Sequence, residues 1–312
     1  MVTISNTYCM NIRDLRYVIA VADEKHFGRA ALACNVSQPA LSGQIRKLEG
    51  FLGVVLFERT NKSVQITPIG EQIIAQARQL VIQSDEIVAT AQSAQSPFEG
   101  PFRLGMIATI GPYLSPLILP TIRQELPDVL LTLIEGMTIN LEKQVVDGKL
   151  DGAIIATEPN DPHLSKICLY EEPFRVALSK AHPLAYQKTV SIGELSHEEL
   201  LLLSDGHCLR DQVLDVCQFS TGATNSNTME TSMETLLSLV ASGNGVTLAP
   251  ALTASSVSWL GDQVVMREEP SGIAKRKVRL VSRASYPRLA LLNRVASIIR
   301  ANVPVALVNV LE

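Results

Sequence analysis

The sequence predicts a multidomain α/β protein with a small N-terminal domain of helices and two short strands, one long helix, and a larger α/β body. Three observations predict it: helical spacing of apolar residues up to residue 66, a coiled-coil repeat after residue 67, and short apolar strands alternating with helices from residue 102. A chain of 312 residues is also long for one compact core. We expect a leader at 1–9, a first domain at 10–67, a linker helix and hinge at 68–99, and a body at 100–312.

Composition excludes several classes of protein. No apolar run reaches the roughly 18 residues that span a bilayer, and the first residues lack the pattern of a signal peptide, so we expect a cytoplasmic protein with no membrane segment. The five cysteines are irregularly spaced, without a CxxC or Cys/His cluster, so neither a disulfide framework, a metal site nor a cofactor is expected.

Charge is distributed unevenly along the chain. The net charge is −4, but residues 1–66 hold eight Lys/Arg against five Asp/Glu, a net of +3, which leaves −7 for the rest. A weakly basic head on an acidic body is expected when only the N-terminal domain meets nucleic-acid phosphates.

The first domain opens with two helices. Apolar residues at helical spacing mark the buried face of the first: Leu15, Val18, Ile19 and Ala22. A short second helix is predicted at 27–33. A third begins after the N-cap Ser37, with Pro39 in its first turn, where a missing N–H costs little. Its buried stripe is Leu41, Ile45, Leu48 and Leu52.

The opposite face of this third helix is polar and carries Gln38, Ser42, Arg46 and Lys47. Such side chains suit the major groove, because Gln can bridge an adenine edge and Arg can reach guanine or phosphate. Two short strands at 56–59 and 64–66, joined by a turn, follow and place Arg59 and Lys62 on a wing. The pattern indicates a winged helix-turn-helix, although periodicity alone leaves open a small helical bundle with a solvated polar face.

A long helix is expected from the N-cap Thr67 and Pro68 to about residue 93. Its apolar and small residues recur at alternating spacings of three and four: Ile69, Ile73, Ala77, Leu80, Ser84, Ile87 and Ala91. This narrow seam is typical of a coiled coil and would pair two DNA-binding domains. Residues 92–100, rich in Ser, Gln and Pro, form the predicted hinge.

The body alternates strands and helices. Strands are predicted at 102–107, 129–134, 152–156, 174–178, 200–203, 246–248 and 278–281, and helices at 114–125, 140–147, 232–242 and 287–301. This order favours two α/β lobes with mainly parallel sheets. Ligands bind beyond the carboxyl ends of strands in such folds, where the loops carry Thr109, Thr138 and Cys208.

The segment from Ser204 to Cys217 holds two cysteines nine positions apart, with His207 before the first and Arg210 close after it. Cationic and hydrogen-bonding neighbours favour the reactive thiolate, so Cys208 is a candidate redox centre and Cys217 a possible partner. In a helix their Cα atoms would lie about 13 Å apart on opposite faces, whereas a disulfide requires about 7 Å or less. Bond formation would unwind the segment. The alternative is two inert, buried thiols.

Residues 30–33, 36–42, 45–49, 52–53, 56–59 and 67–70 resemble the DNA-binding domain of the LysR-type transcriptional regulators. The resemblance implies a dimeric or tetrameric regulator that reads promoter DNA through Gln38, Pro39 and Ser42. It also implies a two-lobed regulatory domain like that of periplasmic binding proteins. The chain would cross between lobes near 170–172 and 282–284, so lobe I would comprise 100–171 and 285–312, and lobe II 172–284.

Residues 105–114, 205–212 with Cys217, and 234–236 leading to Gly243 are similar to the hydrogen-peroxide-sensing members of that family. The resemblance implies that Cys208 is the peroxidatic thiol and Cys217 its disulfide partner. The implied peroxide pocket comprises Thr109, Thr138, His207, Arg210 and Arg283.

The implied partners are promoter DNA, RNA polymerase, further copies of the chain in a dimer of dimers, and glutaredoxin or thioredoxin systems as reductants. The implied role is that of an activator of oxidative-stress genes, not an enzyme. Two alternatives stay open: a LysR-type regulator that binds a small organic anion between the lobes, and a thiol peroxidase with an accessory domain.

Overall fold

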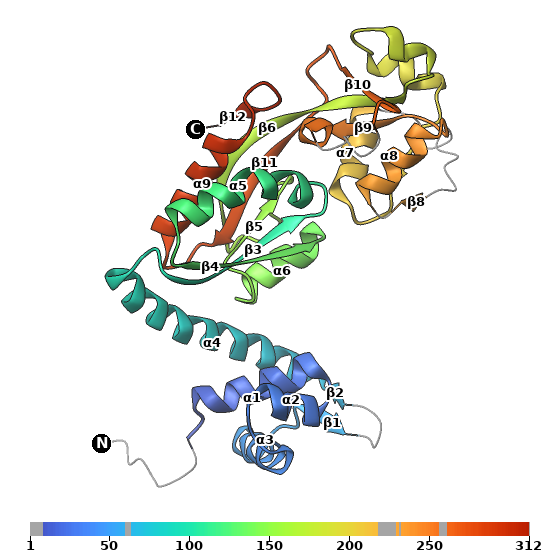
Figure 1. Cartoon of the computed structure of the whole chain (residues 1–312). Coiled ribbons are helices and arrows are strands. Elements are labelled where there is room, and N and C mark those ends of the chain that lie inside the picture. The colour runs from blue at the N-terminus through green and yellow to red at the C-terminus, as the bar shows by residue number, and fades with distance from the viewer. Residues whose placement is uncertain (1–8, 60–63, 218–228, 231, 256–260, 312) are drawn as a thin grey trace. The chain divides into compact units, whose positions relative to one another are not determined.

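The computed structural model describes residues 9–59, 64–217, 229–230, 232–255 and 261–311, which fall into two compact units, 1–95 and 96–312 (Figure 1). The helices in this part of the chain are α1 (Ile12–Glu24), α2 (Phe27–Ala33), α3 (Gln38–Leu52), α4 (Pro68–Gln95), α5 (Gly111–Glu125), α6 (Thr138–Val146), α7 (Cys208–Cys217), α8 (Met233–Ala241) and α9 (Leu289–Asn302), with short 3-10 helices η1 (Pro183–Tyr186), η2 (Ile192–His197) and η3 (Ala251–Ser255). The strands are β1 (Phe57–Arg59), β2 (Val64–Ile66), β3 (Gly100–Ile107), β4 (Val129–Gly136), β5 (Gly152–Ile155), β6 (Leu164–Ser179), β7 (Leu202–Leu203), β8 (Met229–Glu230), β9 (Thr247–Pro250), β10 (Val264–Glu268), β11 (Lys275–Arg283) and β12 (Asn309–Val310).

The first unit contains the three predicted helices and an antiparallel β1–β2 hairpin. Ser37 caps α3, since its hydroxyl accepts a hydrogen bond from the Ala40 amide at 3.3 Å. The core is the predicted one with two differences: Val21 is fully buried where Ile19 is half-buried, and Leu52 at the end of α3 is half-buried. The predicted leader before residue 9 and the turn at 60–63, which includes Lys62, lie outside the described residues.

Helix α4 begins where the sequence predicts, since the Thr67 hydroxyl accepts a hydrogen bond from the Gly70 amide at 2.9 Å. One side of α4 packs on α1 through Ile74 and Ala77, and ion pairs join Arg78 to Asp23 and Arg16 to Asp85. Most of the predicted coiled-coil repeat faces away from this contact. Its members Ile69, Leu80 and Ile87 are exposed in the single chain, whereas Ala77 serves the contact with α1.

The second unit is built on one mixed sheet with the strand order β10-β6-β11-β5-β3-β4. Only β3–β4 and β3–β5 pair in parallel within it, whereas β6 pairs antiparallel with β9, β10, β11 and β12. The expectation of mainly parallel sheets is therefore wrong. Antiparallel pairing follows because β6 and β11 run between the lobes as extended strands instead of being joined by crossover helices.

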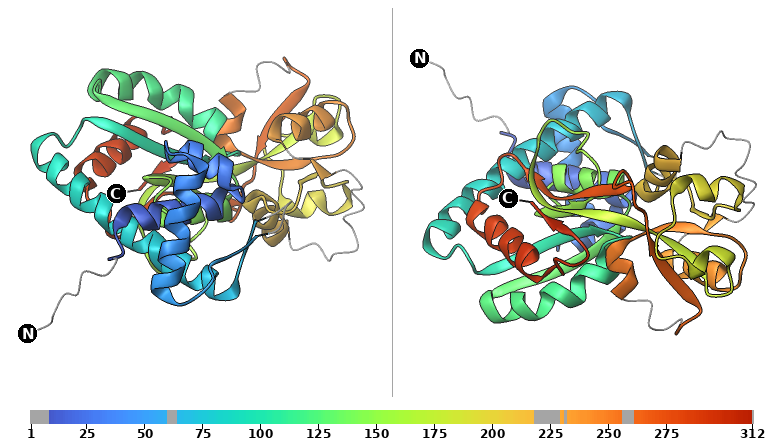
Figure 2. Two further views of the ribbon diagram at one scale, coloured as in Figure 1. Left: turned by 90° about the horizontal axis from the view of Figure 1, so that it is seen from below. Right: turned by 90° about the horizontal axis from the view of Figure 1, so that it is seen from above.

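Strand β6 belongs to both lobes (Figure 1, Figure 2). Its first part pairs with β11 as far as Pro173, and from Phe174 onward it pairs with β9. The first crossing therefore lies next to the predicted one at 170–172. Helices α5, α6 and α9 contact lobe I strands or each other, and α8 contacts the part of the sheet shared by β6 and β10.

The second crossing differs from the prediction at 282–284. Residues Arg279 to Val281 of β11 already pair with β5 in lobe I, and the Phe174 amide donates to the Ala274 carbonyl at 2.7 Å. The chain thus returns to lobe I near residue 274. The sequence hides this point because the charged residues at 275–277 do not look like a strand that enters a core.

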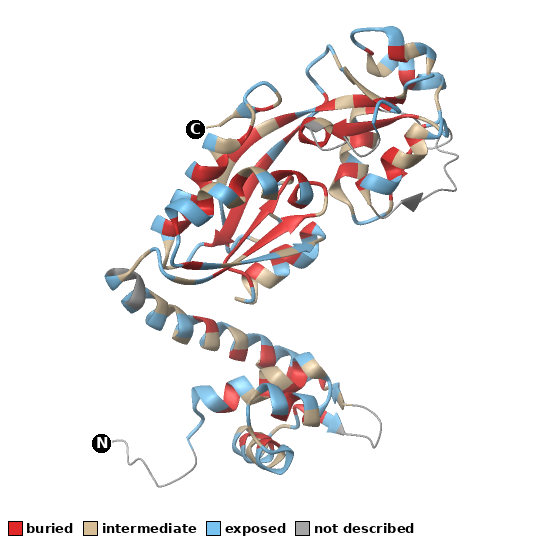
Figure 3. Ribbon diagram, viewed as in Figure 1, coloured by how far each residue is buried: buried red, intermediate tan, exposed pale blue. Residues whose placement is uncertain are grey.

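Buried residues concentrate on the sheet and on the inner sides of its helices (Figure 3). They form one core that includes residues of both lobes and of α7. Within the described ranges, no helix is both long and apolar enough to traverse a bilayer, and no group of three or more metal-ligating side chains is present.

Candidate redox site

Cys208 is the first residue of α7 and follows a tight turn after β7. Gly206 in this turn has φ = +92°, a backbone conformation that residues with a Cβ atom rarely adopt. The Arg210 guanidinium holds the turn, because it donates to the Leu203 carbonyl at 3.2 Å and pairs with Asp205 at 3.0 Å. The turn thus places Cys208 at a helix N-terminus, whose partial positive charge favours an anion.

The Cys208 thiol is half-buried and lies among polar groups. Burial raises the pKa of this thiol above its ordinary value, and this effect outweighs the lowering by the Arg276 charge and by the Thr138 hydroxyl. Asp211, one turn along α7, raises the thiol pKa further. The polar groups of the site therefore offset part of the rise in the thiol pKa that burial causes, and the charge of Arg276 has the largest lowering effect.

Arg276 is almost fully buried and joins both lobes. Its guanidinium donates to Glu172 Oε2 at 2.9 and 2.8 Å, to Thr109 Oγ1 at 2.9 Å and to the Thr109 carbonyl at 3.0 Å. Glu172 is its cross-strand partner in the β6–β11 ladder, and Glu172 Oε1 accepts from the Leu252 amide at 2.7 Å. Both members of this buried ion pair therefore have further hydrogen bonds, which hold them in place. Because the pair lies where β6 and β11 pass between the lobes, this hinge also fixes the position of the Arg276 charge that acts on the Cys208 thiol.

Arg283 does not reach this site, which corrects the prediction from sequence. It lies seven residues from Arg276 on β11, a distance of about 23 Å along a strand. Its guanidinium donates to the carbonyls of Val145 at 2.7 Å and Leu150 at 3.0 Å, and lies 5.6 Å from the Tyr286 ring. Arg283 therefore connects β11 to the end of α6. Arg276, and not Arg283, is the arginine whose charge acts on Cys208.

The sequence held a signal for Arg276 that was missed. Lys275, Arg276 and Lys277 look like a solvated charge run, but a strand points alternate side chains to opposite faces. The two lysines are exposed and Arg276 between them is buried. Alternation thus places Arg276 on the face opposite to the two lysines, and in this structure that face is the buried one.

Gln212 is a second residue that the sequence did not single out. It lies one helical turn after Cys208 on the same face of α7, and its amide donates to the Ala156 carbonyl of lobe I at 2.7 Å. Among the described residues, its Oε1 atom is buried without a hydrogen-bond partner, as is Thr138 Oγ1. The Thr138 hydroxyl is close enough to Cys208 to lower the thiol pKa, but the pair lacks the geometry of an ordinary hydrogen bond.

The other residues of the predicted peroxide pocket differ in how closely they are connected to Cys208. Thr109 follows β3, and its hydroxyl accepts a hydrogen bond from Arg276. Thr138 begins α6, and its hydroxyl lies close enough to Cys208 to lower the thiol pKa. His207 is half-buried directly before α7, and its carbonyl accepts the Arg210 amide at 3.0 Å. Arg210 is two residues beyond Cys208, about 200° around the helix, and is engaged with the turn.

Cys217 ends α7 in an apolar environment. It is 4% exposed and continues the buried stripe of Leu209 and Val213. Burial raises the pKa of its thiol to about 11. Both cysteines are free, and nine helical residues separate their Cα atoms by about 13 Å on opposite faces. A bond between them therefore requires α7 to unwind. The Ser/Thr-rich segment that follows Cys217 lies outside the described residues up to residue 228.

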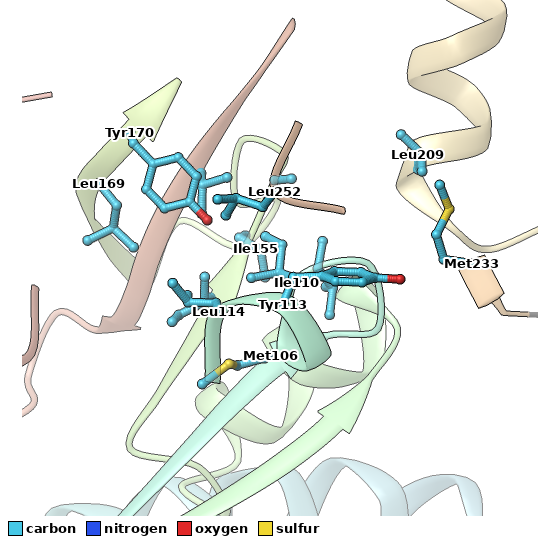
Figure 4. Packing of buried hydrophobic residues seen from close by; sticks show 14 of the residues in the cluster. Met106, Ile110, Tyr113, Leu114, Ile155, Leu169, Tyr170, Leu209, Met233 and Leu252 are labelled. Carbon is cyan, nitrogen blue, oxygen red and sulfur yellow. The ribbon is translucent and has the colours of Figure 1, made fainter. Parts of the chain in front are cut away.

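Two polar contacts from this region connect the lobes directly. Tyr113 of α5 points from lobe I toward Met233 and Leu209 (Figure 4), and its hydroxyl donates to Glu234 of α8 at 3.0 Å. Burial, together with Glu234, raises the pKa of Tyr113. The second contact is that of Gln212 with Ala156. Both involve α7 or α8, so a change in α7 alters the contacts between lobes.

The residues predicted to read DNA on α3 are accessible in the first unit, and their contacts with DNA stay a prediction. Gln38, Pro39, Arg46 and Lys47 are exposed, and Ser42 is half-buried. The buried residues of the same helix are Leu41, Ile45 and Leu48. The side chain of Arg59 and all of Lys62 fall outside the part of the chain that the structure describes, so the wing contacts stay a prediction.

Comparison with known proteins gives a family match for each of the two units. Residues 12–71 match the bacterial regulatory helix-turn-helix proteins of the lysR family, and residues 95–304 match the LysR substrate binding domain. The Escherichia coli DNA-binding transcriptional dual regulator OxyR is 41% identical over 297 residues, which cover 94% of this chain and 95% of the relative.

Solved structures agree with this match. A full-length OxyR variant from Pseudomonas aeruginosa superposes with a TM-score of 0.82 at 36% identity and covers 95% of this chain and 96% of that chain. The oxidized form of Corynebacterium glutamicum OxyR is 32% identical, with a TM-score of 0.57 over 96% of this chain and 93% of that chain. The chain therefore belongs to the LysR family of bacterial helix-turn-helix regulators, and within it to the group of the hydrogen peroxide-inducible genes activators.

Proposed function

We propose that this chain is a DNA-binding transcriptional activator of oxidative-stress genes that senses hydrogen peroxide through a reversible Cys208–Cys217 disulfide. One observation carries the proposal. Two free thiols stand at opposite ends of α7, the first beside Arg276 and Thr138 and the second inside the apolar core. An oxidant that joins them must change the fold, which is what a sensor requires.

The chemistry takes two balanced steps. The Cys208 thiolate attacks one peroxide oxygen, the O–O bond breaks, and the departing hydroxide takes up a proton to give water and a sulfenic acid. The Cys217 thiol then attacks the Cys208 sulfur, a disulfide forms, and a second water leaves. A thiol reductant of the glutaredoxin or thioredoxin type reduces the disulfide back to two thiols and resets the switch.

Five residues position the peroxide in this proposal: Thr109, Thr138, His207, Gln212 and Arg276. The buried oxygens of Thr138 and Gln212 make no hydrogen bond in the described part of the structure, so a peroxide O–H that donates to them would relieve a cost of about 1–3 kcal/mol each. Arg276 stabilises the negative charge of the thiolate before attack and the charge that develops on the leaving oxygen during it. Arg210 shapes the turn before Cys208 and does not bind the peroxide.

The disulfide signal passes from α7 to DNA through the contacts between lobes. Unwinding α7 removes the Gln212 anchor on lobe I, one of the polar contacts that hold the lobes together, as the Tyr113–Glu234 hydrogen bond does. In a dimer of dimers, repacked regulatory domains would turn the paired α4 helices and change the spacing of the α3 reading surfaces on promoter half-sites. RNA polymerase would respond to that spacing in the cytoplasm.

Mass spectrometry of the thiols after one equivalent of hydrogen peroxide tests the sensing step. We expect a Cys208–Cys217 disulfide in the wild-type protein and none in Cys208→Ser, with promoter binding retained by the variant. Cys168→Ser, a half-buried thiol on β6, is the matched control and should oxidise like wild type. If Cys208 stays reduced while a small organic anion alters promoter binding, the protein is an effector-binding regulator of the same family.

A further inference from the structure

Met137 packs against the turn that presents Cys208. A Cβ atom added to Gly206 would lie 3.0 Å from Met137 Sδ and 3.6 Å from Met137 Cε, so the thioether rests on the bare glycine backbone. Met137 belongs to lobe I, directly before α6, and Gly206 belongs to lobe II. Gly206 also has φ = +92°. The backbone conformation therefore disfavours a side chain at position 206, and a Cβ atom there would also require the Met137 thioether to move by a few tenths of an ångström.

The neighbours of this contact place it beside the thiol. Thr138 follows Met137 and lies near Cys208, which is two residues after Gly206. The start of α6 and the turn before α7 therefore contact each other at two adjacent points: Met137 contacts Gly206, and Thr138 lies near Cys208. Met137 is 37% exposed and Gly206 is exposed, whereas Thr138 is buried. The Met137 side chain is therefore on the solvent side of the Thr138–Cys208 contact.

We propose that Met137 narrows the opening to Cys208 and makes the site selective for hydrogen peroxide over alkyl hydroperoxides; this inference rests on the proposed function. With an alkyl hydroperoxide, the thiolate would attack the hydroxyl oxygen, the O–O bond would break, and the alkoxide would leave and be protonated to an alcohol. The sulfur chemistry is the same. The difference is the alkyl group, which must fit between the lobes where the methionine side chain lies.

The test compares two oxidants on the full-length reduced protein. The probes are hydrogen peroxide and tert-butyl hydroperoxide, and the measurement is the rate of Cys208–Cys217 disulfide formation by mass spectrometry. In Met137→Ala we expect the rate with tert-butyl hydroperoxide to rise by about tenfold or more, with less than about a twofold change for hydrogen peroxide. Met137→Leu keeps most of the bulk and should keep the wild-type ratio of the two rates.

Ile139→Ala is the matched control, because Ile139 lies two residues after Met137 in the first turn of α6, is apolar and is 71% exposed. It should leave both rates unchanged. The inference is overturned if Met137→Ala keeps the wild-type ratio, or if Ile139→Ala changes the ratio equally. A wild-type protein whose Cys208 does not react with hydrogen peroxide contradicts the proposed function itself, and this inference with it.

Discussion

The two ends of helix α7 are built differently. Cys208 at the start is near a buried guanidinium and a threonine hydroxyl, and Gln212 on the same face is hydrogen-bonded to lobe I. Cys217 at the end continues an apolar stripe with Leu209 and Val213. The first end is positioned by directional bonds to both lobes, and the second by apolar packing alone.

This difference indicates which cysteine moves. Hydrogen bonds and ion pairs fix angles and distances, so the Cys208 environment has one arrangement in which its chemistry works. Apolar packing is non-directional and can be formed again by other side chains once α7 unwinds. Cys217 can thus leave its place at a moderate cost, while the reactive thiol stays with Arg276. We expect the disulfide to form at the Cys208 end of the helix.

The largest expected effect separates the two cysteines. Cys208→Ser should abolish peroxide oxidation, because the attacking sulfur is gone. Cys217→Ser should still form a sulfenic acid at Cys208, at a rate within about twofold of wild type, but no intramolecular disulfide. Dimedone trapping followed by mass spectrometry distinguishes these products. Equal loss of the sulfenic acid in both variants would show that the two ends do not divide the work in this way.

The next effect contrasts the two buried arginines of β11. Arg276→Met leaves Glu172 buried without its cation, which should destabilise the protein by about 3–5 kcal/mol. It also removes a charge that lowers the Cys208 pKa, so the rate of thiol alkylation should rise at higher pH than in wild type.

Arg283→Met is the control for this pair. It should destabilise by about 1–3 kcal/mol through two lost carbonyl partners, with an unchanged pH profile of Cys208 alkylation. Urea unfolding and iodoacetamide kinetics measure the two quantities. Should Arg276→Met fail to fold, Arg276→Lys keeps the charge and loses the bidentate bond to Glu172. An Arg283 variant with a shifted profile would restore the assignment made from sequence.

Local signals explain what the sequence predicted well. The caps Ser37 and Thr67 start their helices as expected, and the segment between the two cysteines is the helix that the sequence analysis considered, spanning Cys208–Cys217. Such features depend on residues a few positions apart, so spacing and capping rules identify them. The separation of the two thiols followed directly from the length of the helix.

Long-range pairing explains what the sequence did not predict. Arg276 finds Glu172 and Thr109 at sequence separations of 104 and 167 residues. Strand alternation places Arg276 on the opposite face from Lys275 and Lys277, but only the register of β6 and β11 shows that this face is the buried one. The same register places the second lobe crossing near residue 274. Both errors therefore have one cause, an unrecognised antiparallel strand pair at the hinge.

The apolar end of α7 should make stability depend on pH. The Cys217 thiol has a pKa of about 11 against an ordinary value of 9.0. Its contribution is fully present below pH 9, and it is lost as the pH rises toward 11, because the unfolded chain ionises there first. The loss amounts to roughly 2–3 kcal/mol.

Urea midpoints of the reduced protein at about pH 8 and about pH 10.5 measure this loss. Burial also raises the pKa of Tyr170 and Tyr286, so these side chains likewise lower the stability as the pH rises above their ordinary value of 10.0. The relevant quantity is therefore the difference between wild type and Cys217→Ala, whose stability should fall less with pH. Identical pH dependence in both proteins would mean that Cys217 is more solvated than its 4% exposure indicates.

The smallest expected effect concerns Arg210, at the reactive end but directed away from the sulfur. Its partner Asp205 has a side chain that is 79% exposed, so the ion pair contributes about 0–1 kcal/mol. Arg210→Ala should therefore lower stability by no more than about 1 kcal/mol and leave Cys208 oxidation within about twofold of wild type, measured by urea unfolding and dimedone trapping. Arg210→Lys, which keeps the charge, is the control. A loss of oxidation rate in Arg210→Ala that Arg210→Lys restores would mean that this cation reaches the peroxide during reaction, and the reactive end of α7 would then depend on two arginines instead of one.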